Sequence, residues 1–312
     1  MDHSVVRGRF APSPTGRMHL GNVYSALMSW LYCKKENGQM VLRIEDLDPD
    51  RSRMCYAEML EEDLHWLGLD WDEGGSISGD HAPYYQSRCQ DYYSRILDEL
   101  RKQAEIYPCF CSRGELHVAG APHDSDGVYL YRGTCFHMPA EEIKKKSLSR
   151  SPSFRIHIPK NTWISFSDGN YGPVTVELSS TCGDFILRRS DGVYSYQLAV
   201  VADDIRMGIT QVVRGRDLLS STPRQIWLYR LLGQEPPAYI HVPLLVSNDG
   251  KRLSKRDMGL NLSELRKTFR APQIIGRLAF LAGLIPEYRE MMPGDLLSFT
   301  PSSLRKEDIV CG

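Results

Sequence analysis

The sequence predicts an α/β protein with a doubly wound parallel sheet, an inserted α+β module and a small helical region at the end of the chain. Three observations support this class. A strand–turn–helix–strand pattern runs from residue 8 to about 75, short strands and turns follow over 106–180, and longer apolar segments then return. With 312 residues, 42% of them hydrophobic, the chain is long enough for two or three domains.

Residues 1–105 are expected to form the first half of the sheet. Apolar residues recur at helical spacing and then alternate along the next segment, which predicts a helix at 22–35 and a strand at 39–45. Two further helices are expected at 54–67 and 86–105. A strand–helix–strand order is typical of the βαβ unit, whose two strands are parallel.

Residues 106–182 are expected to be the inserted module, because Pro, Gly, Asn and Asp separate its short strands. Residues 183–246 should then resume the sheet, through a strand at 185–187, an apolar segment at 198–202 and a strand at 209–214. For the helix expected at 223–232, Thr222 is the predicted N-cap and Gln225 completes a capping box. Residues 247–312 hold a basic loop and short helical segments.

The opening segment from Arg9 to Asn22 reads RFAPSPTGRMHLGN and joins a strand to a helix. Its prolines restrict φ and Gly16 permits a sharp bend. Gly21 lets a ligand approach the backbone where the helix N-terminus presents free N–H groups to an anion. This segment therefore predicts a site for nucleotide phosphates.

A second segment, RLSKR at 252–256, supplies positive charge on a loop that begins at Asn248-Asp249-Gly250. Lys255 is placed to move onto the phosphates in the transition state. Alone, the first segment would be a surface turn and the second a solvated basic loop. Their order, with an apolar strand at 243–246 before the second, favours a shared ATP site.

These two segments resemble the HIGH and KMSKS signatures of class I aminoacyl-tRNA synthetases. The form RFAPSPTG is similar to the glutamyl/glutaminyl subgroup, and the similarity continues through RIED at 43–46, the segment 201–204 and VRGRDLL at 213–219. The resemblance implies a Rossmann-like catalytic domain with His19 and Lys255 as catalytic residues. The implied ATP-binding residues are His19, Gly21, Asn22, Leu253, Ser254 and Lys255. Arg252 and Arg256 depart from the family's Lys and Ser.

The same resemblance implies a site for L-glutamate. The implied binding residues are Arg9, Phe10, Ala11, Pro12, Ser13, Glu45, Tyr196 and Arg214. Glutamate carries two carboxylates and one ammonium group, which call for guanidinium groups and a carboxylate. Three alternatives stay open: a surface ion-pair cluster around Arg43, an edge-strand position for Arg214, and a core role for a tyrosine of the 194–196 segment.

Three of the eight cysteines, Cys109, Cys111 and Cys135, lie close together in the insertion. Close cysteines in a reducing compartment suggest thiolate ligation of a structural Zn²⁺ ion. His117, His123 and His137 are chemically obvious choices for a fourth ligand. The family's shortened members instead have C-x-C followed by Y-x-x-x-C, so the resemblance implies Tyr131. Buried thiols without a metal are the alternative.

The shortened members that the chain resembles are the glutamyl-Q tRNA(Asp) synthetases, which have no anticodon-binding domain. They activate glutamate with ATP and attach it to the queuosine base in the anticodon loop of tRNA(Asp). The resemblance thus implies L-glutamate, ATP with Mg²⁺ and tRNA(Asp) as partners and one Zn²⁺ per chain. The alternatives are a truncated glutamyl-tRNA synthetase that charges a tRNA 3′ end and a catalytically silent RNA-binding paralog.

Composition restricts the partners further. The formal net charge of −1 means that RNA contacts must come from a local basic surface, for which the Lys144–Lys146 run is a candidate. No apolar run approaches the roughly 18 residues of a membrane span, and the first residues lack a secretory signal pattern. We therefore expect a cytoplasmic protein without membrane contact, and a monomer.

Overall fold

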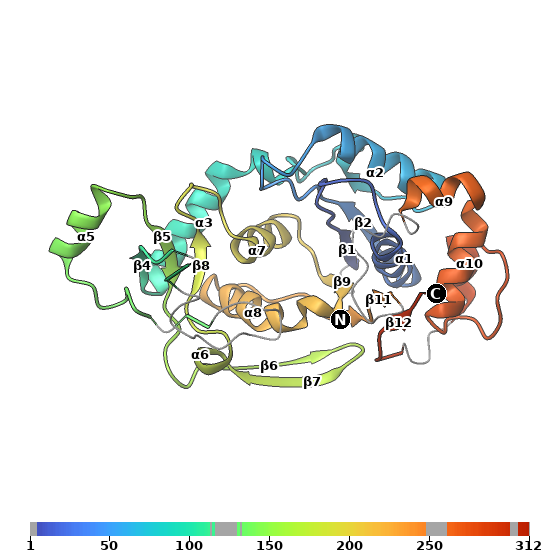
Figure 1. Ribbon diagram of the computed structural model, residues 1–312. Helices are drawn as coiled ribbons and strands as arrows, with labels where there is room; N and C mark the ends of the chain where they lie inside the picture. The colour runs from blue at the N-terminus through green and yellow to red at the C-terminus, as the bar shows by residue number, and fades with distance from the viewer. Residues whose placement is uncertain are drawn as a thin grey trace.

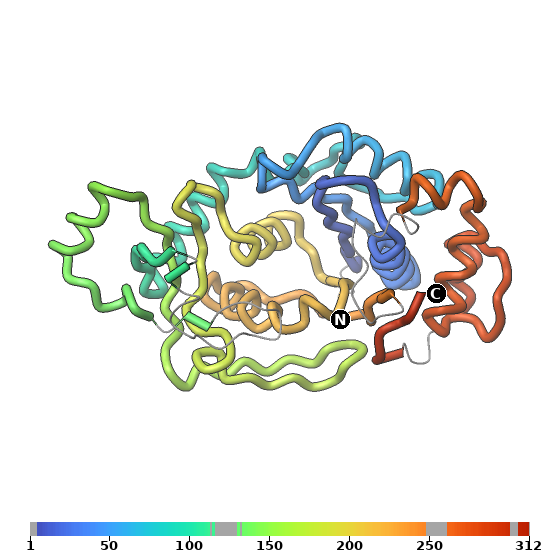
Figure 2. The backbone as a smooth tube through the Cα atoms, in the orientation of Figure 1, coloured from blue at the N-terminus to red at the C-terminus, as the bar shows by residue number. Residues whose placement is uncertain are grey.

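The computed structural model describes residues 5–112, 114–115, 130–131, 133–247, 261–299 and 305–311. Figure 1 shows an elongated molecule in which the inserted module with β4, β5, β8 and α5 lies at one end, and helices α9 and α10 lie at the other. Figure 2 follows the same course from the blue N-terminal part through the green insertion to the red C-terminal segment. The central parallel sheet lies between these two ends.

The central sheet has five parallel strands in the order β10-β9-β1-β2-β3. These strands are β1 (Arg7–Phe10), β2 (Gln39–Leu42), β3 (Glu73–Gly74), β9 (Gln211–Gly215) and β10 (Ala238–Val242). The chain builds β1 to β3 outward in one direction and later adds β9 and β10 on the other side of β1. A parallel sheet with this reversal has its ligand crevice at the carboxyl ends of the strands beside the switch point.

Helices cover both faces of this sheet, as a doubly wound fold requires. They are α1 (Leu20–Lys35), α2 (Met54–Leu67), α3 (Gln90–Gln103), α7 (Tyr196–Arg206) and α8 (Thr222–Leu231). Met40 and Leu42 of β2 face the apolar core shared with α1 and α2, whereas Val41 faces the core shared with α3, α7 and α8. The expected α/β class is confirmed, and the helix predicted at 54–67 has those bounds.

The insertion contains a three-stranded antiparallel sheet in the order β4-β5-β8 and a separate β6–β7 hairpin. Its elements are β4 (Ile106–Cys109), α5 (Ala140–Ser147), β5 (Ser153–Ile156), β6 (Trp163–Asp168), β7 (Gly172–Glu177), α6 (Leu178–Thr181) and β8 (Phe185–Arg188). The hairpin strand β6 packs against α8 and β10, so the insertion contacts the central sheet directly.

Helices and one strand pair form the C-terminal region. Its elements are β11 (Leu245–Val246), α9 (Leu262–Thr268), α10 (Ala271–Leu281) and β12 (Ile309–Val310), with a 3₁₀ turn at Pro293–Ser298. Strand β12 pairs in parallel with β11, so a segment near the end of the chain supports the strand that precedes the RLSKR loop. Among the described helices, none combines the length and apolarity needed to span a bilayer.

Three local expectations are wrong. The apolar segment at 198–202 is not a strand of the sheet, because it lies within helix α7. The strand expected at 185–187 does not resume the parallel sheet, because β8 pairs antiparallel with β5. Periodicity identifies such a short apolar strand but carries no information about which sheet it joins. In addition, Thr222 is the first residue of α8 rather than its cap, and Ser221 at the N-cap position makes no side-chain capping bond. Thr222 Oγ1 instead accepts a hydrogen bond from Arg214 Nη2 at 2.8 Å.

Candidate active site

A cavity of about 440 Å³ opens at the carboxyl ends of β1 and β9, on either side of the switch point. Every described residue that the sequence assigned to glutamate or ATP lines it: Arg9, Phe10, Ala11, Pro12, Ser13, His19, Gly21, Asn22, Glu45, Tyr196 and Arg214. Strand pairing alone places several of these side chains together, since β1 neighbours both β2 and β9. One continuous site thus contains groups from segments far apart in the chain.

His19 caps α1, whose first turn lines the part of the cavity that the sequence assigns to ATP. The Gly21 N–H donates to His19 Nδ1 at 3.1 Å, and the His19 N–H donates to Asn22 Oδ1 at 3.2 Å. Because Nδ1 accepts a bond, the proton of a neutral ring lies on Nε2. The helix start therefore combines an imidazole N–H with the positive end of the helix dipole, a combination suited to phosphate oxygens.

A buried charge network lies at the part of the cavity that the sequence assigns to the amino acid. Arg43 is fully buried and pairs with Asp204, and its Nη2 also lies 3.2 Å from Glu45 Oε1. Arg9 Nε lies 3.6 Å from the same Asp204 carboxylate. Burial raises the pKa of Glu45, while the Arg43 and Arg9 cations oppose that rise. The alternative of a surface ion-pair cluster around Arg43 is therefore wrong.

Arg214 is buried in an inner strand, since β9 lies between β10 and β1, so the edge-strand alternative is also wrong. Its Nη2 donates to Thr222 Oγ1, and its Nε donates to His241 Nε2 at 3.0 Å. Its Nη1 is buried without a hydrogen-bond partner among the described residues. A buried donor without a partner is costly, so Nη1 is a natural contact for a bound carboxylate.

Of the two candidate tyrosines, Tyr196 lines the cavity as the first residue of α7. Tyr194 instead packs edge-on against Tyr93 in the core, with ring centroids 5.5 Å apart. Burial raises the pKa of Tyr196, so its hydroxyl stays protonated and can donate a hydrogen bond. These positions favour Tyr196 for substrate contact, and its assignment stays a prediction.

The other ATP-binding assignments, Leu253, Ser254 and Lys255, lie outside the described residues, as do Arg252 and Arg256. The segments on either side of residues 248–260 do lie at the cavity. Pro243, Leu244 and Leu245 line it before residue 248. After residue 260, the Leu262 N–H donates to Met18 O at 2.9 Å, and Asn261 forms a backbone bridge with His19.

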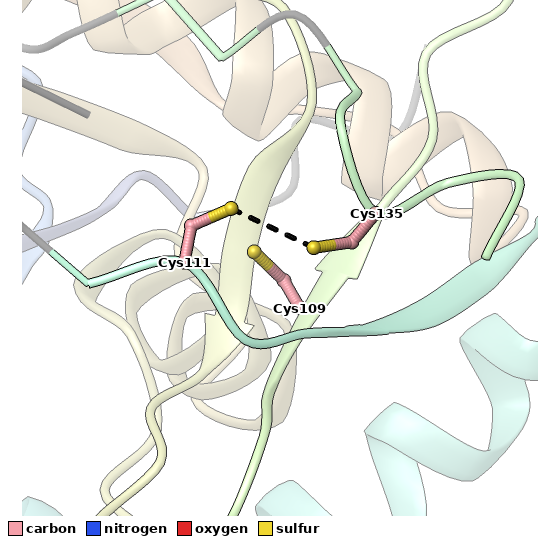
Figure 3. A group of neighbouring side chains, drawn as sticks. All are labelled: Cys109, Cys111 and Cys135. Atoms are coloured by element: carbon pink, nitrogen blue, oxygen red, sulfur yellow. Dashed lines mark hydrogen bonds between the residues drawn. The ribbon is translucent and has the colours of Figure 1, made fainter. Parts of the chain in front are cut away.

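The cysteine cluster lies in the insertion, where the side chains of Cys109, Cys111 and Cys135 point toward one another (Figure 3). Their sulfur atoms all lie within 4.8 Å of one another, and the Cys111 and Cys135 sulfurs are 3.6 Å apart. Two thiolates on a tetrahedral Zn²⁺ with bonds of about 2.3 Å would be separated by roughly 3.8 Å. The donor set and its spacing therefore fit zinc.

Tyr131 lies beside this group. Its hydroxyl oxygen is 3.4 Å from Cys109 Sγ and 3.5 Å from Cys111 Sγ, and it accepts a hydrogen bond from the Cys135 N–H at 2.9 Å. His137 is exposed and does not belong to the cluster, and His117 and His123 lie outside the described residues. Although burial opposes it, the Arg155 cation holds the pKa of Cys109 below its usual value, which favours a thiolate.

The sequence did not assign a role to the acidic pair at the end of α7. Asp204 joins Arg43 and Arg9, and Asp203 accepts hydrogen bonds from Tyr93 Oη at 2.7 Å and Gln86 Nε2 at 2.9 Å. Both aspartates are buried. Their signal in the sequence is the placement of two carboxylates directly after the apolar run LAVVA, where burial forces them to find partners.

The comparisons with known proteins agree with this geometry. The model for the catalytic domain of class I tRNA synthetases (E and Q) matches residues 5–292. The chain is 51% identical over 294 residues to the glutamyl-Q tRNA(Asp) synthetase of Nitratidesulfovibrio vulgaris, which covers 93% of this chain and 90% of that relative. It is 39% identical to glutamate–tRNA ligase 2 of Alkalilimnicola ehrlichii, over 95% of this chain and 62% of that relative.

The fold is also similar to a solved structure. A crystal structure of a glutamate tRNA ligase from Elizabethkingia meningosepticum, in complex with its amino acid, matches with a TM-score of 0.84 at 28% identity. The match covers 99% of this chain and 67% of that one. The chain therefore belongs to the class I tRNA synthetase family of the glutamate and glutamine enzymes, and the five-stranded sheet with its cavity is the catalytic domain of a ligase.

Proposed function

We propose that this protein activates L-glutamate with ATP and transfers the glutamyl group to the queuosine base of tRNA(Asp). The observation that carries the proposal is the 51% identity to a glutamyl-Q tRNA(Asp) synthetase over nine-tenths of both chains, compared with 39% to a glutamate–tRNA ligase. The cavity adds a chemical reason, because its arginines and its carboxylate complement the charges of glutamate.

In the first step, a carboxylate oxygen of glutamate attacks the α-phosphorus of ATP, the bond to the β-phosphate oxygen breaks, and pyrophosphate leaves. Arg9 and Arg214 are proposed to hold the carboxylates, and Glu45 the ammonium group. His19 and the start of α1 hold phosphate oxygens, and Lys255 neutralises the charge that develops on pyrophosphate. ATP enters as its Mg²⁺ complex.

The second step needs room for an acceptor beside the adenylate. A further cavity of about 520 Å³ shares Ser13, Thr15, Glu45 and Tyr196 with the first one. We propose that the acceptor nucleoside enters there. Its hydroxyl attacks the glutamyl carbonyl, an ester bond forms, AMP leaves with the electron pair of the broken mixed-anhydride bond, and the hydroxyl proton passes to the leaving phosphate or to water.

The cysteine cluster is proposed to hold one structural Zn²⁺ through Cys109, Cys111, Cys135 and Tyr131. Four protein ligands leave no open position, so the ion would supply stability rather than catalysis. It would link the end of β4 to the segment around Cys135. We also propose that the protein is cytoplasmic and acts as a monomer. Light scattering on the purified protein would test the oligomeric state.

The deciding experiment follows labelled glutamate. Glutamate-dependent ATP–pyrophosphate exchange is measured first with and without RNA, and we expect exchange without RNA. Labelled glutamate is then offered with tRNA(Asp) that contains queuosine and with matched tRNA(Asp) that contains guanosine instead. Label in the anticodon fragment of the first RNA alone supports the proposal. Label on the 3′-terminal adenosine would establish the truncated charging enzyme. No exchange either with or without RNA would establish the silent paralog.

A further inference from the structure

The guanidinium group of Arg214 is hydrogen-bonded to His241, a fully buried residue of β10. Arg214 Nε donates to His241 Nε2 at 3.0 Å, and the strands that carry the two residues pair in register. Because Nε2 must accept this hydrogen bond, the ring must be neutral with its proton on Nδ1. A protonated imidazolium would present a second N–H to the arginine and place two cations side by side.

Asp168 determines that protonation pattern. Its Oδ2 accepts from His241 Nδ1 at 2.6 Å, and the His241 backbone N–H also donates to this carboxylate at 3.1 Å. Both side chains are fully buried. Burial and the neighbouring Arg214 cation lower the pKa of His241, although Asp168 opposes this, and hydrogen bonds to the carboxylate hold the pKa of Asp168 below its usual value despite burial. The arrangement is therefore a carboxylate, a neutral imidazole and a guanidinium in series.

Asp168 is itself rigidly held, although it belongs to the insertion. It ends β6, and its Oδ1 accepts the N–H groups of Asn170 and Tyr171 at 3.0 and 2.9 Å. The same turn is bonded to β10, since the Gly169 N–H donates to Tyr239 O at 2.9 Å and Asn170 Nδ2 donates to His241 O at 3.1 Å. At Gly169, a Cβ would lie 2.7 Å from Ile240 Cγ1, so any larger residue would force Ile240 or the turn to shift.

We propose that Asp168 and His241 form a positioning pair for the substrate-binding Arg214, which links the β6–β7 hairpin to the amino-acid site. The proposal rests on the proposed role of Arg214 in glutamate binding. His241 and Thr222 fix two sides of the guanidinium group. Nη1 is therefore directed toward the substrate carboxylate, and Arg214 loses little side-chain conformational freedom when the substrate binds. Bidentate or charge-assisted contacts of this kind depend on such prior orientation.

The test uses two variants of His241 that differ in which ring nitrogen they imitate. In His241→Gln, the amide can reach the position of Nε2 and offer Arg214 an acceptor oxygen. In His241→Asn, the shorter amide stays near Asp168 and leaves Arg214 Nε without an acceptor. We expect the Asn variant to raise the KM for glutamate about 10-fold in ATP–pyrophosphate exchange, with the KM for ATP unchanged, and the Gln variant to recover most of this loss.

A double-variant cycle shows whether His241 acts through Arg214. Combining His241→Asn with Arg214→Lys should add little to the Arg214→Lys effect, because the lysine no longer has the Nε–H that His241 accepts. Thermal unfolding identifies variants that fail to fold. If the Asn variant is unfolded, Asp168→Asn, which keeps a carbonyl oxygen for His241 Nδ1, replaces it and should raise the KM for glutamate by a smaller factor.

Two different failures can be told apart. A folded His241→Asn variant with the native KM for glutamate would overturn the positioning pair, as would fully additive effects in the cycle. A fall in kcat with no change in KM, equal in the Asn and Gln variants, would also overturn it by indicating a structural role alone. Absence of glutamate-dependent exchange in the native protein would instead overturn the proposed function.

Discussion

The active-site cavity and the cysteine cluster are built in opposite ways. The clustered cysteines come from a short stretch of chain, and the Tyr131 hydroxyl accepts a hydrogen bond from the Cys135 backbone N–H four residues later. The cavity instead collects side chains from β1, the start of α1, the segment after β2, α7 and β9, whose positions span most of the catalytic domain. A local cluster depends on spacing in the sequence, whereas a distributed site depends on which strands become neighbours.

This difference predicts that changes in the cavity affect the reaction, while changes in the cluster affect the stability of the insertion. The largest effect is expected for Lys255→Ala. Removing a cation from the developing charge on pyrophosphate should lower the rate of ATP–pyrophosphate exchange by about 10²- to 10³-fold. Thermal unfolding should stay near the native temperature, and near-native exchange would exclude the role given to Lys255.

The next largest effect is expected for Arg214→Ala. Losing a charged hydrogen-bond donor to a substrate carboxylate should raise the KM for glutamate about 100-fold, with little change in the KM for ATP. Arg101→Ala is a suitable control, because that arginine is exposed on α3, pairs with Asp98 one turn away, lies over the Phe154 ring and is not among the residues that line the cavity. Equal KM values in both variants would remove Arg214 from the amino-acid site.

A smaller effect is expected from the protonation of Glu45. Burial raises its pKa, so Glu45 takes up a proton at a higher pH than an ordinary glutamate does as the solution is acidified. The protonated form no longer attracts the ammonium group. As the pH is lowered, kcat/KM for glutamate should therefore begin to fall at a pH above the usual pKa of a glutamate side chain. In Glu45→Gln this decrease in kcat/KM at low pH should be much smaller. If the decrease is unchanged in that variant, a group other than Glu45 causes it.

The smallest effect on exchange is expected for Cys135→Ser. The variant should lose bound zinc, measured by metal analysis, and its insertion should unfold at a lower temperature. Exchange should change less than in the cavity variants, because the cluster lies apart from the residues that line the cavity. The exposed Cys55→Ser variant provides the control. Loss of exchange as severe as in Lys255→Ala would show that the two regions are not independent.

Much of the fold was predictable because local rules determine it. The helix at 54–67 followed from apolar spacing alone, whereas the helix expected at 22–35 begins two residues earlier, at Leu20, because His19 caps it. The placement of β8 was not predictable, because a short apolar strand satisfies its hydrogen bonds in either sheet. The same holds for Thr222, whose hydroxyl bonds to Arg214 instead of capping its own helix.

The sequence by itself determined the strand–turn–helix start of the site, the family of the chain and the identity of the three clustered cysteines. Each of these depends on neighbouring residues, so spacing is sufficient to recognise them. Only the tertiary structure decided that Asp204 joins Arg9 and Arg43, and that Asp168 and His241 support Arg214. Such pairings connect residues far apart in the chain, and burial of charge makes them obligatory only after the sheet has brought their strands and hairpins together.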